Sequence, residues 1–259
     1  MIRQKCKMNR GGFTHVLYTL QNHVQFHIDG DRWRLIRYAF EFFEKDDEPN
    51  IGMAHEMKCF LELSSTRKCF IDVGSLFGIF SLAFTSHPDQ VAHAVEPSRA
   101  AHSVLCRNVA CNPERRIIPH RIFLSDSVGY IKTRMDWLHC IATSDDSGVI
   151  SPTTTLDVLS ADNFIRPDCL KIDTEGFEVR ILEGGRKTIA DSRPVIFLEA
   201  HHEMMQSYGD SIENLARILE ELKYDVFTFH LSRIPDFMSF MSDRFRIGYL
   251  LSRIVCFPR

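Results

Sequence analysis

The sequence contains no Cys-x-x-Cys pair, although it has eight cysteines. Structural zinc sites use such closely spaced pairs, so the cysteine spacing argues against a zinc domain. No apolar run approaches the length of about 18 residues that a membrane-spanning helix requires. Internal repeats and low-complexity tracts are absent, and the net charge is only -3. Nucleic-acid-binding proteins usually carry a basic face, so we do not expect nucleic acid as a partner.

The composition is that of an ordinary globular protein. The 259 residues are 44% hydrophobic and 25% charged, which suits one large α/β domain or two small ones. Cys69, Cys169 and Cys256 lie in apolar segments, where a thiol behaves as a small hydrophobic group. This usage is typical of a reducing compartment. Residues 1–28 are basic but no apolar core follows them, so we predict no secretory signal and a cytoplasmic location.

The first part of the chain, residues 1–53, differs from the rest. Gly11-Gly12 and Asp29-Gly30 indicate turns. Apolar residues at helical spacing predict a helix over 33–43. We predict that residues 1–53 form an N-terminal extension and a helical cap over the pocket of the following domain.

From residue 54 onward, predicted strands and helices alternate. Short apolar runs predict strands over 70–73, 91–95, 117–124, 169–173, 195–198, 224–229 and 253–257. Periodicity and capping residues predict helices over 54–63, 79–86, 99–111, from a Thr N-cap near 153–155, from 178 to Gly184-Gly185, and from the Ser211 cap to 223. Short strands are predicted within 130–141, and a polar loop over 143–152. This alternation is typical of a doubly wound α/β sheet.

The strand-turn-helix around two glycines is the most informative single stretch. Asp72 lies in an apolar run, and Gly74 and Gly78 allow the backbone to approach a ligand at the start of the next helix. The dinucleotide fingerprint requires glycine at two positions that Leu76 and Ile79 occupy here. The spacing instead resembles the first motif of class I S-adenosylmethionine-dependent methyltransferases. Two-glycine turns are common, so this stretch alone does not decide the function.

An acidic residue follows the second predicted strand. Glu96 lies about 20 residues beyond the glycine turn, where an acid accepts hydrogen bonds from ribose hydroxyls. The alternative is a surface carboxylate at a strand end. The strand and its order in the chain favour the ribose role.

Further motifs occur in a fixed order along the chain: Ile71-Asp72-Val73-Gly74, Glu96-Pro97, Leu124-Ser125-Asp126, Thr155-Leu156-Asp157, Asp168-x-Leu170-Lys171-Ile172-Asp173-x-Glu175-Gly176-x-Glu178, Leu182-x-Gly184, Arg193-Pro194 and Leu198-Glu199. This ordered set is similar to the FkbM family of methyltransferases, over about residues 54–230. The resemblance implies a Rossmann-like fold with a seven-stranded, mostly parallel sheet, an antiparallel last strand, and S-adenosylmethionine as methyl donor. It also assigns residues 54–259 to an FkbM-like methyltransferase domain. The family usually has Asn where this chain has Leu76.

The resemblance implies a donor site at the carboxyl ends of the first strands. Asp72 and the glycines are expected at the methionine end of the donor, Glu96 at the ribose, and Ser125 or Asp126 near the adenine. The full set of residues predicted to bind the donor is Glu56, Asp72, Gly74, Ser75, Gly78, Glu96, Pro97, Ser98, Ser125, Asp126 and Asp173.

Four residues are predicted to act in catalysis: His201, Asp173, Lys171 and Glu175. Methyl transfer to oxygen requires in-line positioning and usually a base for the hydroxyl proton. A histidine with a pKa of about 6.5 suits this task better than a carboxylate, so His201 is the predicted base. The alternative is a structurally hydrogen-bonded histidine. Lys171 has the same strand parity as Asp173, which predicts an ion pair.

The same segment raises the question of a metal site. Asp173, Glu175, Glu199 and His201 have the side chains that hold a hard divalent cation. Because these carboxylates have backbone and lysine partners nearby, we predict no metal. The predicted function is O-methylation of a hydroxyl on a small molecule or carbohydrate. The alternatives are a catalytically silent methyltransferase-like binding module, which Leu76 favours, and, more distantly, an NAD oxidoreductase.

Overall fold

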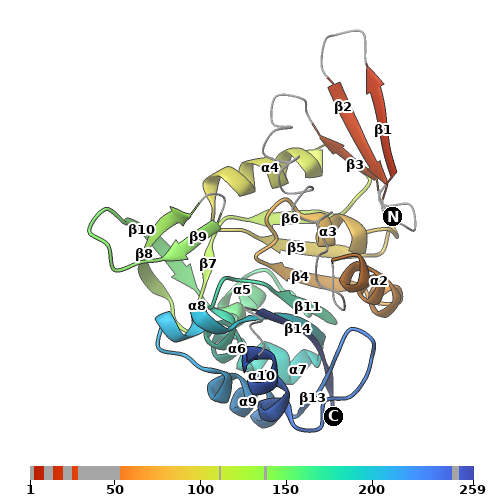
Figure 1. Cartoon of the computed structure of the whole chain (residues 1–259). Coiled ribbons are helices and arrows are strands. Elements are labelled where there is room, and N and C mark those ends of the chain that lie inside the picture. The colour runs from red at the N-terminus through yellow and green to blue at the C-terminus, as the bar shows by residue number, and fades with distance from the viewer. Residues whose placement is uncertain are drawn as a thin grey trace.

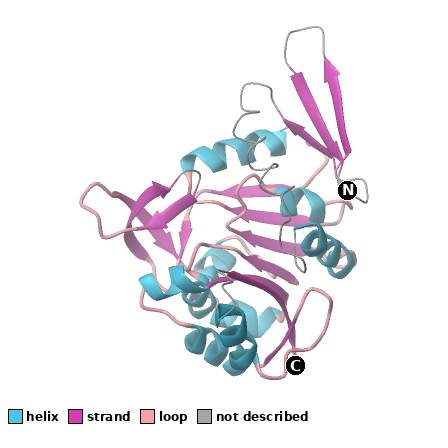
Figure 2. Cartoon of the chain, viewed as in Figure 1, coloured by secondary structure: helices cyan, strands magenta, loops and turns pink. Residues whose placement is uncertain are grey.

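The computed structural model describes residues 3–8, 14–19, 25–28, 53–110, 112–136, 139–246 and 251–259. A seven-stranded sheet forms its centre, with helices on both faces (Figures 1 and 2). From one edge to the other, its strands are β13 (Tyr224–Phe227), β14 (Leu251–Pro258), β12 (Val195–His201), β11 (Cys169–Ile172), β4 (Cys69–Val73), β5 (Val91–Val95) and β6 (Ile117–His120). Neighbouring strands are parallel except at β14, which is antiparallel to both β12 and β13. The doubly wound sheet with an antiparallel last strand is therefore confirmed.

Three helices cover one face of the sheet: α2 (Met53–Ser64), α3 (Ile79–Phe84) and α4 (Arg99–Ala110). Phe60 of α2 is the centre of an aromatic cluster, with its ring centroid 5.1 Å from those of Phe70, Phe80 and Phe197. Because side chains alternate along a strand, Phe70 joins this layer while Ile71 joins the opposite one. Burial of one such ring contributes about 1.5–3 kcal/mol. The cluster therefore fixes α2 against the strands that carry the site.

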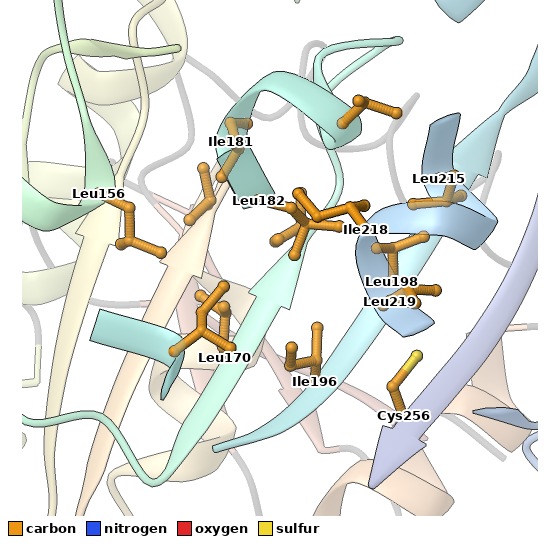
Figure 3. Packing of buried hydrophobic residues seen from close by; sticks show 14 of the residues in the cluster. Leu156, Leu170, Ile181, Leu182, Ile196, Leu198, Leu215, Ile218, Leu219 and Cys256 are labelled. Carbon is orange, nitrogen blue, oxygen red and sulfur yellow. The ribbon is translucent and has the colours of Figure 1, made fainter. Parts of the chain in front are cut away.

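The other face is covered by α5 (Leu156–Asp162), α6 (Glu178–Gly184), α7 (Arg186–Ser192), α8 (His202–Ser207), α9 (Ile212–Glu221) and α10 (Phe237–Arg246). Figure 3 shows leucine and isoleucine side chains of α6 and α9 packed over the central strands. Thr155 and Ser211 cap α5 and α9 by accepting hydrogen bonds from the N–H groups of Val158 and Asn214. Both predicted caps are confirmed, and such a cap contributes about 1 kcal/mol.

The third predicted strand is in fact two strands in different sheets. β6 lies at the edge of the main sheet, which tolerates Pro119 because an edge strand can leave one backbone group unpaired. β7 (Phe123–Leu124) belongs to a second sheet with β10 (Val149–Thr154), β8 (Gly129–Asp136) and β9 (His139–Ala142). β10 lies partly within the predicted polar loop. The sequence also did not indicate α7, α8 or α10, which are short or weakly periodic.

The described residues between 3 and 28 form β-strands, which the sequence did not predict. β1 (Arg3–Met8), β2 (Thr14–Thr19) and β3 (Gln25–Ile28) form an antiparallel sheet, and β3 lies near α4 (Figure 1). Each strand has only four to six residues, too few for the alternation to stand out. The helix predicted over 33–43 lies outside the described residues.

Candidate functional site

A pocket of about 470 Å³ opens at the carboxyl ends of the central strands. Open α/β sheets bind their ligands at this edge. The pocket has an apolar side, which is formed by Val95 at the end of β5 and by Ile122, Phe123 and Leu124 in and just before β7. Residues of β11, β12, β14 and the turns after them give it a charged side, formed by Asp173, Glu175, Glu199, His201, Glu203 and Arg253. The pocket therefore suits a ligand with an apolar part and a charged part.

The glycine turn brings backbone to the pocket wall. The N–H groups of Gly74 and Ser75 both donate to the carbonyl oxygen of Val95, at 3.0 Å. Gly74 has φ +79°, and a Cβ on it would lie 1.8 Å from the carbonyl oxygen of Asp173. The ends of β4 and β11 thus approach so closely that no side chain fits between them.

Leu76 lies in the same turn with φ 49°, in the left-handed region. This conformation costs a residue other than glycine about 1–2 kcal/mol, and asparagine tolerates it better than leucine. Leu76 lines the pocket, and its backbone N–H donates to Oε2 of Glu96 at 2.9 Å. The departure from the family pattern therefore leaves the backbone contact of the turn in place.

Glu96 lies at the pocket wall, where the sequence predicted a ribose-binding acid. Its two carboxylate oxygens accept hydrogen bonds from the backbone N–H groups of Leu76 and Ser98, at 2.9 and 2.8 Å. Burial raises the pKa of Glu96 to about 8, against the opposing effect of these two bonds. Pro97 beside it also lines the pocket.

Four of the predicted donor-binding residues line the pocket, namely Gly74, Glu96, Pro97 and Asp173. Those that do not are Glu56, Asp72, Ser75, Gly78, Ser98, Ser125 and Asp126.

Asp72 was expected to face the crevice. Instead it is buried beneath the turn, where its Oδ2 accepts a hydrogen bond from Oγ of Ser81 at 2.7 Å and burial raises its pKa to about 6. Ser125 donates to Asp126, and neither residue lines the pocket. The apolar residues just before them, Ile122–Leu124, line the pocket instead. The sequence did not indicate that these residues line a pocket, because an apolar run of this kind predicts only a buried strand.

A buried ion network lies under the charged side of the pocket. Nζ of Lys171 is 2.5 Å from Oδ2 of Asp173 and 3.8 Å from Oε1 of Glu56, which confirms the predicted Lys171–Asp173 pair. Arg253 of β14 joins Glu56 to Glu199, with nitrogen-to-oxygen distances of 3.2 and 3.1 Å. Burial would raise the pKa of Asp173, but the charges of Lys171 and His201 and the hydrogen bonds to Lys171 and Glu199 together outweigh it and hold that pKa below its ordinary value. The sequence analysis missed Arg253, whose signal is a charged residue within an apolar last strand.

His201 ends β12 and is surrounded by acids. Its Nδ1 lies 2.9 Å from Oε1 of Glu178, and its Nε2 lies 3.9 Å from Oε2 of Glu175. Burial lowers the pKa of His201, but the hydrogen bond to Glu178 and the nearby negative charges outweigh it and raise the pKa to about 10. A raised pKa favours the protonated imidazole, which does not accept another proton, and this opposes a role of His201 as a free general base. That role stays a prediction.

The turn between β11 and α6 is held from two sides. Oε1 of Glu178 accepts a hydrogen bond from the N–H of Gly176 at 3.1 Å. Gly176 has φ +99°, and a Cβ there would lie 2.6 Å from the backbone of Met204 in α8. This fixed turn carries Glu175 into the pocket.

Comparison with solved structures gives several similar folds. One is the methyltransferase FkbM from Methylobacillus flagellatus, with 16% identity and a TM-score of 0.49, covering 73% of this chain and 43% of that one. Another is an O-methyltransferase from Bacillus cereus in complex with SAH, with 12% identity and a TM-score of 0.48, covering 87% and 91%. A third is the precorrin-6y C5,15-methyltransferase from Geobacter metallireducens, with 13% identity and a TM-score of 0.47, covering 83% and 95%. The chain thus spans less than half the length of the Methylobacillus protein.

No curated protein matches the chain significantly. The Methyltransferase FkbM domain matches residues 72–226, which is more than half of the sequence. This match runs from the glycine turn through Glu96, Asp173 and His201 to β13. The chain therefore belongs to the FkbM methyltransferase domain family.

Proposed function

We propose that the pocket binds S-adenosylmethionine on its apolar side and a hydroxyl-bearing small molecule or sugar on its charged side, and that the product is a methyl ether. S-adenosylmethionine is the cofactor of this methyltransferase family, and it supplies an activated methyl group when bound. The observation that carries the proposal is the division of one pocket into an apolar side and a charged side. We further propose residues 54–259 as the methyltransferase domain.

The residues present fit the donor. Gly74 lines the pocket with bare backbone, and we assign the carboxylate of Glu96, which lines the same pocket, to the ribose hydroxyls. Val95 and Ile122–Leu124 offer an apolar surface for the adenine. The acids at the ends of β11 and β12 complement the ammonium and sulfonium groups of the donor.

We assign the acceptor to the charged side. Asp173 and Glu175 present carboxylates that accept a hydrogen bond from an acceptor hydroxyl, and Glu199, whose pKa burial raises to about 8, takes up the proton of that hydroxyl. His201 holds its place between Glu178 and Glu175, so its role is positioning. Lys171 lies behind Asp173 and orients that carboxylate.

The acceptor class follows from size and charge. The pocket of about 470 Å³ suits a small molecule or a single sugar beside the donor. The net charge of -3 and the acids of the pocket are unfavourable for a nucleic acid. None of the helices in the described residues is long and apolar enough to cross a membrane. The cytoplasmic location stays a prediction.

A catalytically silent binding module is the second candidate. The observation that favours it is Leu76, whose strained backbone and apolar side chain stand in the donor pocket. The methyltransferase would transfer the methyl group of the bound donor to an acceptor, whereas the silent module would transfer none.

The test combines binding and turnover. Calorimetry with S-adenosylmethionine, S-adenosylhomocysteine and NADH should give micromolar or tighter affinity for the first two and none for NADH. Transfer of a labelled methyl group to a panel of sugars and small alcohols should then give a labelled product. Donor binding without transfer to any acceptor favours the silent module, and NADH binding alone would overturn both candidates.

A further inference from the structure

We propose that Asp173, Glu199 and His201 form a binding site for one divalent first-row metal ion. One ligand atom of each of these residues lies within 4.8 Å of the other two, and all three line the charged side of the pocket. The site rests on the proposed function in one respect, since its bound ion would hold the acceptor hydroxyl. The sequence predicted no metal here, because these carboxylates were expected to have backbone and lysine partners nearby.

The spacing of the ligand atoms suits a single ion. Metal–oxygen bonds in such sites are about 2.0–2.6 Å long, so ligands on opposite sides of the ion lie about 4–5 Å apart. Carboxylates and an imidazole together suit ions such as Mn²⁺, which accept both oxygen and nitrogen ligands. The three residues come from the ends of two adjacent parallel strands, which are rigid supports.

His201 is oriented as a metal ligand. Glu178 lies 2.9 Å from its Nδ1, and a proton shared there leaves Nε2 directed to the other side of the ring. A carboxylate that holds the far nitrogen of a histidine is the usual outer partner in metal sites. Glu178 is itself fully buried and held by the N–H of Gly176, so it fixes the ring rigidly.

The two carboxylates are also held in place, each through one oxygen. Lys171 contacts Oδ2 of Asp173, and Arg253 contacts Oε1 of Glu199. Asp173 and Glu199 also share a side-chain hydrogen bond, so a proton lies between these two carboxyl groups. A divalent ion would take the place of that proton, which answers the objection that the acids already have partners.

The formal charges of the side chains around the site also favour a bound cation. In the described part of the chain, five carboxylates contact two permanent cations or His201: Glu56, Asp173, Glu175, Glu178 and Glu199 lie against Lys171, Arg253 and His201. The carboxylates outnumber the cations even when His201 is protonated, and a bound divalent ion would reduce this excess of formal negative charge. Unpaired charge in a buried site costs several kcal/mol per ion, so a bound cation relieves a large penalty.

The ion would give the acceptor side a function that His201 alone does not supply. An ion held by three protein ligands keeps open positions for an acceptor oxygen, and it lowers the pKa of a hydroxyl bound there. A neutral histidine base is then not required.

The experiment uses the full chain, stripped of metal with a chelator and then dialysed. Mn²⁺ is added, and its binding is followed by the loss of the electron paramagnetic resonance signal of the free ion. We expect one Mn²⁺ per chain. Glu199→Gln and His201→Gln should abolish this binding, and Glu178→Gln should weaken it by about 10–100-fold through the outer partner. Glu203→Gln is the matched control, since Glu203 lines the same pocket outside the cluster, and it should bind Mn²⁺ normally.

Each variant is checked for folding by circular dichroism and for S-adenosylhomocysteine binding by calorimetry. The metal site is overturned if the wild type leaves the Mn²⁺ signal unchanged at millimolar concentration, or if Glu199→Gln and His201→Gln bind Mn²⁺ like the wild type. If S-adenosylhomocysteine still binds in that case, the proposed function stands without the metal. If neither ligand binds, the proposed function fails as well.

Discussion

The carboxylate of Glu96 serves two purposes at the residue scale. It holds the N–H groups of Leu76 and Ser98, and it faces the pocket beside Pro97. At about pH 9, above the pKa of about 8 that burial gives Glu96, Glu96→Ala should weaken S-adenosylhomocysteine binding by about 10–150-fold, because hydrogen bonds to a charged group contribute about 1.5–3 kcal/mol. Isothermal calorimetry measures the change, with circular dichroism to confirm folding. Unchanged affinity would remove Glu96 from the donor site.

Single residues show where sequence reasoning succeeds and where it ends. The Lys171–Asp173 pair follows from strand parity, which is local information. The environment of His201 does not, because Glu178 and Glu175 reach it across a turn from a neighbouring strand. The pKa of His201 is raised above its ordinary value because of these tertiary contacts. Arg253 was missed for the same reason, since its partners lie on α2 and β12.

At the scale of elements, the turn between β4 and α3 requires glycine at position 74, because no side chain fits there. Gly74→Ala would place a Cβ 1.8 Å from the carbonyl oxygen of Asp173, and so push apart the ends of β4 and β11. We expect loss of S-adenosylhomocysteine binding and a large fall in the free energy of unfolding.

Gly209→Ala is the matched control for this substitution. Gly209 has a similar φ of +82°, but a Cβ there meets nothing within 4 Å. It should cost only the backbone strain of about 1–2 kcal/mol and leave donor binding intact. Urea denaturation of both variants separates strain from collision, and equal losses would show that the close approach of the two strands is unimportant.

The edge of the sheet at β5 and β6 contains a pair of histidines. The rings of His93 and His120 stack with centroids 5.2 Å apart, and Nδ1 of His93 is 3.0 Å from Nε2 of His120. Burial, aided by the charge of His120, lowers the pKa of His93 to about 4, and burial also lowers the pKa of His120. His102 on α4 also acts on the pKa of His120, and Arg121 lies near His102.

This pair predicts a pH-dependent stability. Between about pH 6.5 and 4 the unfolded chain binds a proton at residue 93 and the folded chain does not. Stability due to His93 is therefore present above pH 6.5 and is lost as the pH falls toward 4. Urea midpoints at pH 7 and pH 5 should fall less in His93→Gln than in the wild type. An equal fall in both proteins would contradict the prediction.

Elements with strong periodicity or clear caps were predicted well from the sequence, and those defined by pairing were not. The caps Thr155 and Ser211 mark α5 and α9 through local hydrogen bonds. β7 and β10 exist because Phe123 and Leu124 pair with Thr153 and Thr154, which are distant in the chain. The strands between residues 3 and 28 were missed because each has only four to six residues.

At the scale of the whole molecule, Arg253 ties the last strand to the first helix of the domain. It contacts Glu56 on α2 and Glu199 on β12. Arg253→Met should lower the free energy of unfolding by about 3–5 kcal/mol, because it leaves buried carboxylates without their cation.

The double variant Arg253→Met/Glu56→Gln tests the origin of that loss. Removing the charge of Glu56 should recover part of the stability, so the two effects should not be additive. Chemical denaturation of the two single variants and the double variant gives the coupling energy. Simple additivity would mean that Arg253 stabilises the fold through packing alone.

The position of β14 has a consequence for how the chain reaches its native state. In the described main sheet β13 pairs with β14 alone, and β14 separates it from β12. Until β14 inserts, the apolar strand Val195–His201 presents an open edge, and open edges recruit other chains. Refolding from denaturant should therefore lose yield to aggregation as protein concentration rises. β14, which contributes Arg253 to the pocket, thus also covers an edge at which other chains would pair.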